Sequence, residues 1–235
     1  MSIGDAEIKT QERVIRFFKD PEILGYQYIG NLSDYQNKNI KEDRLRQYLR
    51  LKGYADKLVD AAVMQLQQEA GNLSRGVYDA NKTVYSRLKY GIPVSESPEK
   101  PPVTVQLVDE EKPLNNDFAI AEEVTVVEQS EKRPDLVVYL NGIAVAVIEL
   151  KRSSISVSEG IRQNLTNQKN SFIQSFFTTM QFCMAGNESE GLRYGTLLTG
   201  EKFYMEWKDD GFKEHEEERD SVDVRISKTC EGIEN

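Results

Sequence analysis

Three ionisable side chains stand at the ends of two otherwise apolar segments, where their types and spacing could support catalysis. Asp135 opens the segment Asp135–Leu140, while Glu149 and Lys151 close the segment that begins at Ile143. Charged groups at the ends of apolar strands are costly to place near a core unless they pair with one another or bind a metal ion. The three residues therefore form either a salt-bridged hairpin end or a catalytic metal site.

Composition narrows the kinds of site that are possible. One histidine, His215, and two cysteines, Cys183 and Cys230, exclude the usual zinc site and a disulfide framework. Any catalysis must then use carboxylates, lysines or hydroxyl groups. No apolar run approaches the roughly 20 residues of a membrane-spanning helix, and the first residues lack an apolar signal core. We therefore expect a cytoplasmic protein without membrane contact.

Charge is unevenly distributed along the chain. The net charge is −9, with +3 on residues 1–92 and −12 on residues 93–235. This balance argues against broad electrostatic adhesion to nucleic acid, which requires lysine and arginine to neutralise phosphates. It remains compatible with a nucleic-acid enzyme that brings a divalent metal ion to clustered carboxylates.

The elements that must position the three residues form a β-hairpin. The segments Asp135–Leu140 and Ile143–Leu150 are joined at Asn141-Gly142, a strong hairpin signal. With a simple two-residue turn, Asp135 would face away from Glu149, because a one-residue change of register reverses every side chain. A catalytic site therefore predicts a bulged loop with Gly142 in a left-handed conformation, or an equivalent twist near Asp135.

Residues 118–208 are expected to form an α/β (α+β) core, a mixed central sheet flanked by helices. Phe118–Val127 is strand-like, and the two hairpin segments are apolar enough to be central strands. Ser156 and Glu159 have the spacing of a capping box, which predicts a long helix running to about Ala185. A second hairpin is expected from Tyr194–Thr199 and Lys202–Trp207.

The remaining regions flank this core. Residues 1–92 are predicted to be a helical N-terminal region that packs against the sheet, since such a sheet needs helices on both faces. Residues 93–117 hold five of the seven prolines and are typical of a linker, although Val103–Val108 alternates like an edge strand. Residues 209–235 form an acidic C-terminal tail. The expected helices are residues 12–18, 42–51, 55–69 and 79–90.

The motifs of the core resemble a known family. Arg133–Gly142 reads RPDLVVYLNG, and Val147–Lys151 reads VIELK. Both are similar to the PD-(D/E)xK nuclease superfamily, and more specifically to the N-terminal nuclease region of the endonuclease (R) subunit of type I restriction-modification enzymes. The resemblance is strong over residues 115–208 and continues through Glu159–Gln168, Met184–Asn187 and Gly191–Gly195. It implies a restriction-endonuclease-like core.

The resemblance also implies roles for individual residues. Asp135 and Glu149 match the metal-binding carboxylates, and the carbonyl group of Leu150 matches a further metal ligand. Lys151 matches the lysine that orients or polarises the attacking water, and Gln163 matches a glutamine that contacts DNA.

The resemblance implies less about three further positions. Where several relatives have a tyrosine four residues after that glutamine, this chain has Asn167. Glu12 could supply the acid that the superfamily often takes from an early helix, or it simply lies on a solvated helix face. Arg152 either contacts a phosphate or is solvated.

The implied activity is Mg²⁺-dependent hydrolysis of phosphodiester bonds in duplex DNA. Two carboxylates suit a hard cation such as Mg²⁺, for which Mn²⁺ is the expected substitute. Such a cation lowers the pKa of a bound water and neutralises charge that develops on the scissile phosphate. The ammonium group of Lys151 would place or deprotonate that water and stabilise the transition state.

The whole enzyme of this family is longer than the chain and carries ATP-driven motor domains. Gly195–Gly200 imitates the glycine spacing of a phosphate-binding loop, but Glu201 occupies the lysine position. The chain therefore resembles an endonuclease-domain fragment of a type I site-specific deoxyribonuclease, with ATP used only in the missing motor domains. Methylation and specificity subunits are the expected partners, and the isolated fragment is expected to be weakly active or silent.

Two other interpretations fit the same residues. The chain could be a stand-alone repair or recombination nuclease of the superfamily. It could also be a catalytically silent docking module with a nuclease-like fold, in which Asp135, Glu149 and Lys151 merely pair. Binding of Mg²⁺ or Mn²⁺ separates the docking module from the two nucleases.

Overall fold

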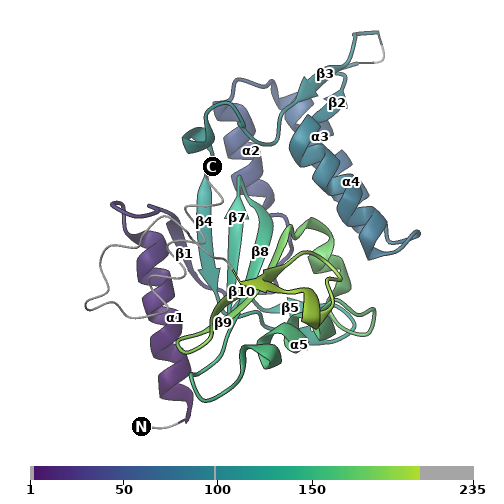
Figure 1. Ribbon diagram of the computed structural model, residues 1–235. Helices are drawn as coiled ribbons and strands as arrows, with labels where there is room; N and C mark the ends of the chain where they lie inside the picture. Colours follow the sequence, from purple (N-terminus) through teal and green to yellow (C-terminus); the bar gives the residue numbers. More distant parts are fainter. Residues whose placement is uncertain (1–2, 98, 207–235) are drawn as a thin grey trace.

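A mixed seven-stranded sheet forms the centre of the molecule (Figure 1). The computed structural model describes residues 3–97 and 99–206. The order of the strands across the sheet is β1-β4-β7-β8-β9-β10-β11. Their bounds are Gln27–Asn31 (β1), Phe118–Glu122 (β4), Leu136–Leu140 (β7), Ile143–Leu150 (β8), Phe182–Asn187 (β9), Gly191–Gly195 (β10) and Met205–Glu206 (β11). The expectation of a mixed central sheet flanked by helices is confirmed.

Two pairs of neighbouring strands in the sheet are parallel, and the other pairs are antiparallel. β1 pairs in parallel with β4, and β8 pairs in parallel with β9. Because parallel neighbours need a crossover, the chain passes from β8 to β9 through the helix α5, Val157–Asn167, and the 3₁₀ helix η2, Gln174–Thr179. The strands β7 and β8 therefore lie at the middle of the sheet, as their uniformly apolar sequences predict.

Different helices cover the two faces of the sheet. The helix α1, Ile3–Lys19, places Val14 and Phe18 against Ile120 of β4 and Ile148 of β8. On the opposite face, Phe176 and Phe177 of η2 pack on alternate residues of β7 and β8, and α5 lies over β9. Alternation along β8 thus assigns Ile148 and Leu150 to the α1 face and Val147 and Glu149 to the α5 face.

A bulge in the central hairpin sets the register of the whole β7–β8 pair. Asn141 and Gly142 both have positive φ, of 52° and 82°, as in the type I′ turn that a two-residue hairpin loop favours. The register then shifts between Val138 and Tyr139, where β8 carries one additional residue, Val145. The expected one-residue shift is therefore present, but it lies inside the strand pair and not in the loop.

The turn residue Gly142 lies against the start of the helix α2, Glu42–Leu51. A Cβ atom there would lie 2.7 Å from the carbonyl oxygen of Lys41 and 2.8 Å from the backbone nitrogen of Leu45. Contacts below about 3 Å force neighbouring backbone to move, and the positive φ of this residue already disfavours any side chain. Gly142 is therefore required both by the turn and by the close approach of α2.

Replacing Gly142 by alanine is expected to destabilise the fold by about 2–5 kcal/mol. Roughly 1–2 kcal/mol comes from the left-handed conformation, and overpacking against α2 adds about 1–3 kcal/mol. The measurement is urea unfolding followed by circular dichroism. Gly53→Ala is the matched control, since Gly53 also has a positive φ but open space at its Cβ position. Equal losses in the two variants would contradict the close-approach argument.

A second group of helices packs beside the sheet. It consists of α2, α3 (Asp56–Gly71) and α4 (Val77–Tyr90), whose bounds agree with the predicted helices within two residues. The proline-rich segment packs on this group, because β2 (Ile92–Val94) and β3 (Val103–Val105) form an antiparallel pair. Val105 and Leu107 are fully buried, so the edge-strand alternative describes this segment better than a linker does.

Two predicted elements were wrong. The helix expected from Ser156 to Ala185 ends at Asn167, and Phe182–Asn187 is the strand β9, because the buried position beside β8 selects a strand from an apolar run that fits either structure. The strand β1 lies in a region predicted to be helical. The second hairpin exists between β10 and β11, but its strands are shorter than expected.

Two short strands and two 3₁₀ turns complete the described residues. They are β5 (Val126–Val127), β6 (Glu131–Lys132), η1 (Pro113–Asn115) and η3 (Glu201–Phe203). No helix among the described residues is long and apolar enough to cross a membrane. Trp207, His215, Cys230 and the acidic tail 209–235 lie outside the described residues.

Candidate active site

The bulge in β8 brings Asp135 opposite Glu149. The register pairs Leu136 with Ile148 at the end of the ladder, so the next position pairs Asp135 with Glu149 on the α5 face. The backbone N–H of Leu150 donates a hydrogen bond of 2.7 Å to Oδ2 of Asp135. The hairpin thus places the two carboxyl groups side by side at the end of the central strands.

Glu149 is completely buried, and its carboxylate oxygens accept no hydrogen bond from the described residues. Burial raises the pKa of Glu149 well above its usual value, and the negative charge of Asp135 raises it further. The ammonium group of Lys151 acts in the opposite direction. A buried carboxyl group without a donor is unfavourable as an anion, so this position is suited to a proton or a cation.

Lys151 directly follows Leu150, the last residue of β8, and lies on the same face of the sheet as Glu149. Its backbone N–H donates to the carbonyl oxygen of Gly186 at 2.9 Å, which extends the parallel ladder with β9. Its side-chain Nζ donates to the carbonyl oxygen of Leu150 at 3.0 Å. The lysine, the two carboxylates and the Leu150 carbonyl group therefore form one cluster.

This donor set fits a hard divalent cation. Asp135, Glu149 and the carbonyl oxygen of Leu150 are oxygen ligands of the kind that Mg²⁺ takes, with water filling its other positions. The unpartnered oxygens of Glu149 are the observation that favours such an ion. The described residues contain no group of three or more His, Cys, Asp or Glu side chains arranged to hold a metal.

A third acid near the cluster was not found from the sequence. Glu123 follows β4 with a positive φ of 51°, and its charge contributes to the raised pKa of Glu149. Its carboxylate pairs with Arg133 at 2.9 Å and accepts a hydrogen bond of 3.3 Å from Gln11. Glu123 lies inside the predicted strand 118–127 beside Glu122, and no sequence signal distinguished it.

Glu12 does not reach the cluster. It lies on the exposed face of α1, where it lines a shallow depression with Arg16 and Lys19. The neighbouring residue Gln11 faces the sheet instead and is buried. Successive residues of a helix point about 100° apart, so an acid beside an inward-facing residue turns to solvent.

Gln163 shares a surface depression of about 540 Å³ with Lys151. The depression lies along α5, which begins where Oγ of Ser156 accepts a hydrogen bond from the N–H of Ser158. The predicted N-terminal cap is therefore present, although the side chain of Glu159 pairs with Arg162 and does not return to the cap. Asn167 also lines the depression, whereas Arg152 does not.

A glycine allows α5 to lie close to the acid cluster. A Cβ atom on Gly160 would lie 3.0 Å from Cβ of Ala185 and 3.5 Å from Cβ of Glu149. The helix therefore covers Glu149 directly, which accounts for the complete burial of its carboxyl group. The sequence places this glycine one residue after the capping-box Glu159, and that position carried no signal for close packing.

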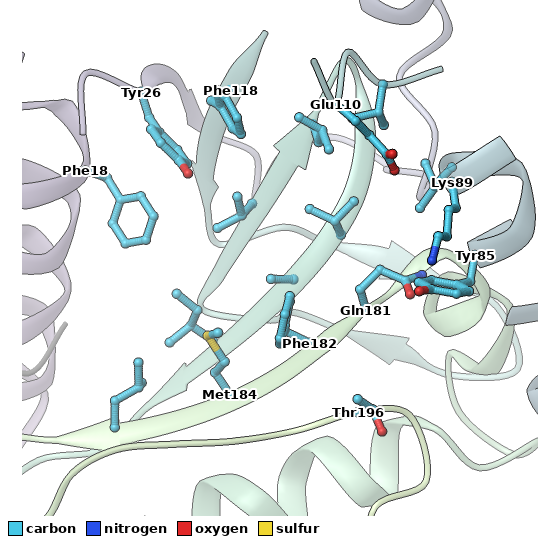
Figure 2. Close-up of a pocket in the computed structure, with 18 residues that line it drawn as sticks. Phe18, Tyr26, Tyr85, Lys89, Glu110, Phe118, Gln181, Phe182, Met184 and Thr196 are labelled. Carbon is cyan, nitrogen blue, oxygen red and sulfur yellow. The ribbon is translucent and has the colours of Figure 1, made fainter. Parts of the chain in front are cut away.

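A larger cavity lies on the other face of the sheet. Figure 2 shows it between aromatic residues of α1 and β4 on one side and Tyr85 and Lys89 of α4 on the other. Its volume is about 750 Å³, and its floor is formed by apolar residues of β7, β8 and β9. Because alternate residues of β8 face opposite sides, this cavity is separated from Glu149 by the sheet.

The fold and the cluster together define an α/β protein with two facing carboxyl groups and a lysine on its central hairpin. The family model described as type I restriction enzyme R protein N terminus matches residues 7–203. The chain therefore belongs to this family of N-terminal regions of type I restriction enzyme R proteins. No curated protein matches the chain.

Proposed function

We propose that this chain is a Mg²⁺-dependent endonuclease module that cleaves phosphodiester bonds of duplex DNA. The observation that carries the proposal is the pair of facing carboxyl groups, one of them buried without a hydrogen-bond donor, beside Lys151. A proton or a metal ion relieves the repulsion between two such groups. Membership of the R protein family favours the metal ion and a nuclease reaction.

The proposed roles follow from the positions of the residues. Asp135, Glu149 and the Leu150 carbonyl group hold the cation, which supplies a water of lowered pKa and charge neutralisation at the phosphate. Asp135 is held in place by the N–H of Leu150. Lys151 orients the attacking water and stabilises negative charge on the phosphate oxygens. Gln163 contacts DNA from the wall of the adjoining depression.

In the full enzyme we propose that this module works with ATP-driven motor domains and with the methylation and specificity subunits, in the cytoplasm. Cleavage by the whole assembly then depends on the motor, and the isolated module is slow. Duplex DNA is the proposed substrate, since the family is that of restriction enzyme R proteins.

The first test is calorimetric titration of Mn²⁺ into the chain. Wild-type protein is expected to release heat with one saturable site, because the cluster provides three oxygen ligands. Asp135→Ala should abolish that heat, whereas Glu12→Ala, which removes an exposed carboxylate of α1, should leave it unchanged. Absence of heat in the wild-type protein, or equal heats in the wild type and Asp135→Ala, would contradict the proposed metal site.

A further inference from the structure

The acid cluster opens to the surface on one side. Glu149 is completely buried under α5, and Asp135 is held by the N–H of Leu150. Lys151 differs, since it lines the depression of about 540 Å³ on the α5 face. The depression is therefore a route by which a phosphate group reaches Lys151.

Two separate elements line the depression. Five of its residues come from α5, and they include Gln163, while Lys132 comes from the strand β6. β6 pairs with β5 in a short antiparallel hairpin that lies beside the end of α5 in Figure 1. The depression is thus a cleft lined by α5, by the β5–β6 hairpin through Lys132, and by Lys151.

The positive charges of the cleft differ in their availability. Arg162 is engaged by Glu159 at 2.7 Å and by Glu201 at 2.8 Å, so its charge is largely neutralised. Lys132 makes no ion pair with a described carboxylate, and its Nζ lies 4.7 Å from the ring centre of Phe172. Stacking on an aromatic ring positions an ammonium group without cancelling its charge. Lys132 is therefore available to pair with an anionic ligand.

We propose that the β5–β6 hairpin forms the second wall of a DNA cleft and that Lys132 binds a backbone phosphate beside the phosphate that is cleaved. The inference rests on the proposed function, because it uses Lys151 to locate the scissile phosphate. Lys132 and Gln163, which come from different elements, then both contact the DNA backbone. In a chain with a net charge of −9, an unpaired lysine in this cleft counters the repulsion of DNA by the surrounding acids.

Salt-dependent DNA binding tests the assignment without any cleavage. Binding of a fluorescent duplex is followed by anisotropy in EDTA, from 50 to 200 mM salt, for wild type, Lys132→Ala and Lys82→Ala. Lys82 is an exposed lysine of α4 and does not line the depression. Each phosphate contact contributes about 0.9 to the slope of log affinity against log salt. Lys132→Ala should lower the slope by about that amount. The loss of affinity between 50 and 200 mM salt should then be about 3- to 4-fold smaller than for wild type.

Each outcome decides a different point. Equal slopes for wild type and Lys132→Ala, or an equal decrease in Lys82→Ala, would overturn the role of Lys132 and leave the proposed function standing. Failure of the wild-type chain to bind duplex DNA at 50 mM salt would overturn the proposed DNA substrate itself. Lys132→Gln keeps the aliphatic stem over Phe172 and replaces the alanine variant if that variant unfolds, and Lys132→Arg should restore the wild-type slope.

Discussion

Lys151→Ala is expected to lower the rate of duplex DNA cleavage about 10³-fold while the chain still binds Mn²⁺. Removal of a positioned proton-transfer group or of one charge-stabilising donor costs roughly 10²–10⁴ in rate. Lys151 is not a proposed metal ligand, and its ammonium group repels a cation. Its loss should therefore leave metal affinity unchanged or stronger. Lys151→Ala therefore separates catalysis from metal binding, whereas Asp135→Ala is expected to abolish both.

The measurement is nicking of supercoiled plasmid in Mg²⁺ or Mn²⁺ under single-turnover conditions, with calorimetry on the same samples. Lys82→Ala serves as the control, since it removes an equal charge from the exposed face of α4. An unchanged nicking rate in Lys151→Ala would contradict the catalytic role of Lys151. Loss of metal binding in that variant would show instead that the lysine is required to shape the carboxylate pair.

Local signals predicted the central hairpin well, because its residues satisfy short-range and long-range requirements together. Asn141 and Gly142 favour a two-residue turn, and the flanking apolar runs favour central strands. The alternation argument correctly required a one-residue shift between Asp135 and the turn. It placed the shift in the loop or near Asp135, however, whereas the extra residue is Val145 within β8. Bulge positions depend on how neighbouring strands and helices pack, and the sequence of one hairpin does not determine them.

The errors occurred where an apolar run fits two structures. The apolar residues of Phe182–Ala185 have a spacing compatible with a helix. Only pairing with β8 makes this segment a strand. Gln27–Asn31 is short and polar at both ends, so its pairing with β4 had no local signal. Both strands are parallel to their partners, and parallel pairing is determined by contacts that are distant in the sequence.

The candidate site divides in the same way. Asp135, Glu149 and Lys151 were found because they interrupt apolar runs, where a charge is conspicuous. Glu123 and Lys132 lie among other charged residues, so their proximity to the cluster is visible only after folding. For Glu12, two alternatives followed from the sequence, and the structure shows the solvated helix face.

Glu149→Gln is expected to stabilise the metal-free protein above pH 5, although it removes a proposed metal ligand. The pKa of Glu149 is raised in the folded protein above the ordinary value of 4.5. The folded state therefore binds a proton that the unfolded state has released, and the free energy of unfolding falls as pH rises from about 4.5 to the raised pKa. Each unit of that interval costs about 1.4 kcal/mol. Glutamine stays neutral and should remove this loss.

The test is thermal unfolding in EDTA between pH 4 and pH 8. For a chain of this size, about 1 kcal/mol corresponds to roughly 2–4 °C in Tm, so the advantage of Glu149→Gln over wild type should grow measurably with pH. Glu12→Gln makes the same chemical change at an exposed position and should follow the wild-type curve. Curves for wild type and Glu149→Gln that stay parallel across this range would contradict the raised pKa.

Addition of Mn²⁺ should reverse the order of stability between wild type and Glu149→Gln. A ligand at 100 times its dissociation constant stabilises the folded state by about 2.7 kcal/mol, and only the wild-type cluster has both carboxylates to hold it. The wild-type Tm should therefore rise with Mn²⁺ at pH 8 while that of Glu149→Gln stays constant. The destabilising effect of Glu149 on the metal-free protein and its capacity to bind a cation then have one cause. Its buried carboxylate accepts no hydrogen bond from the described residues. An equal rise in both proteins would place the metal elsewhere.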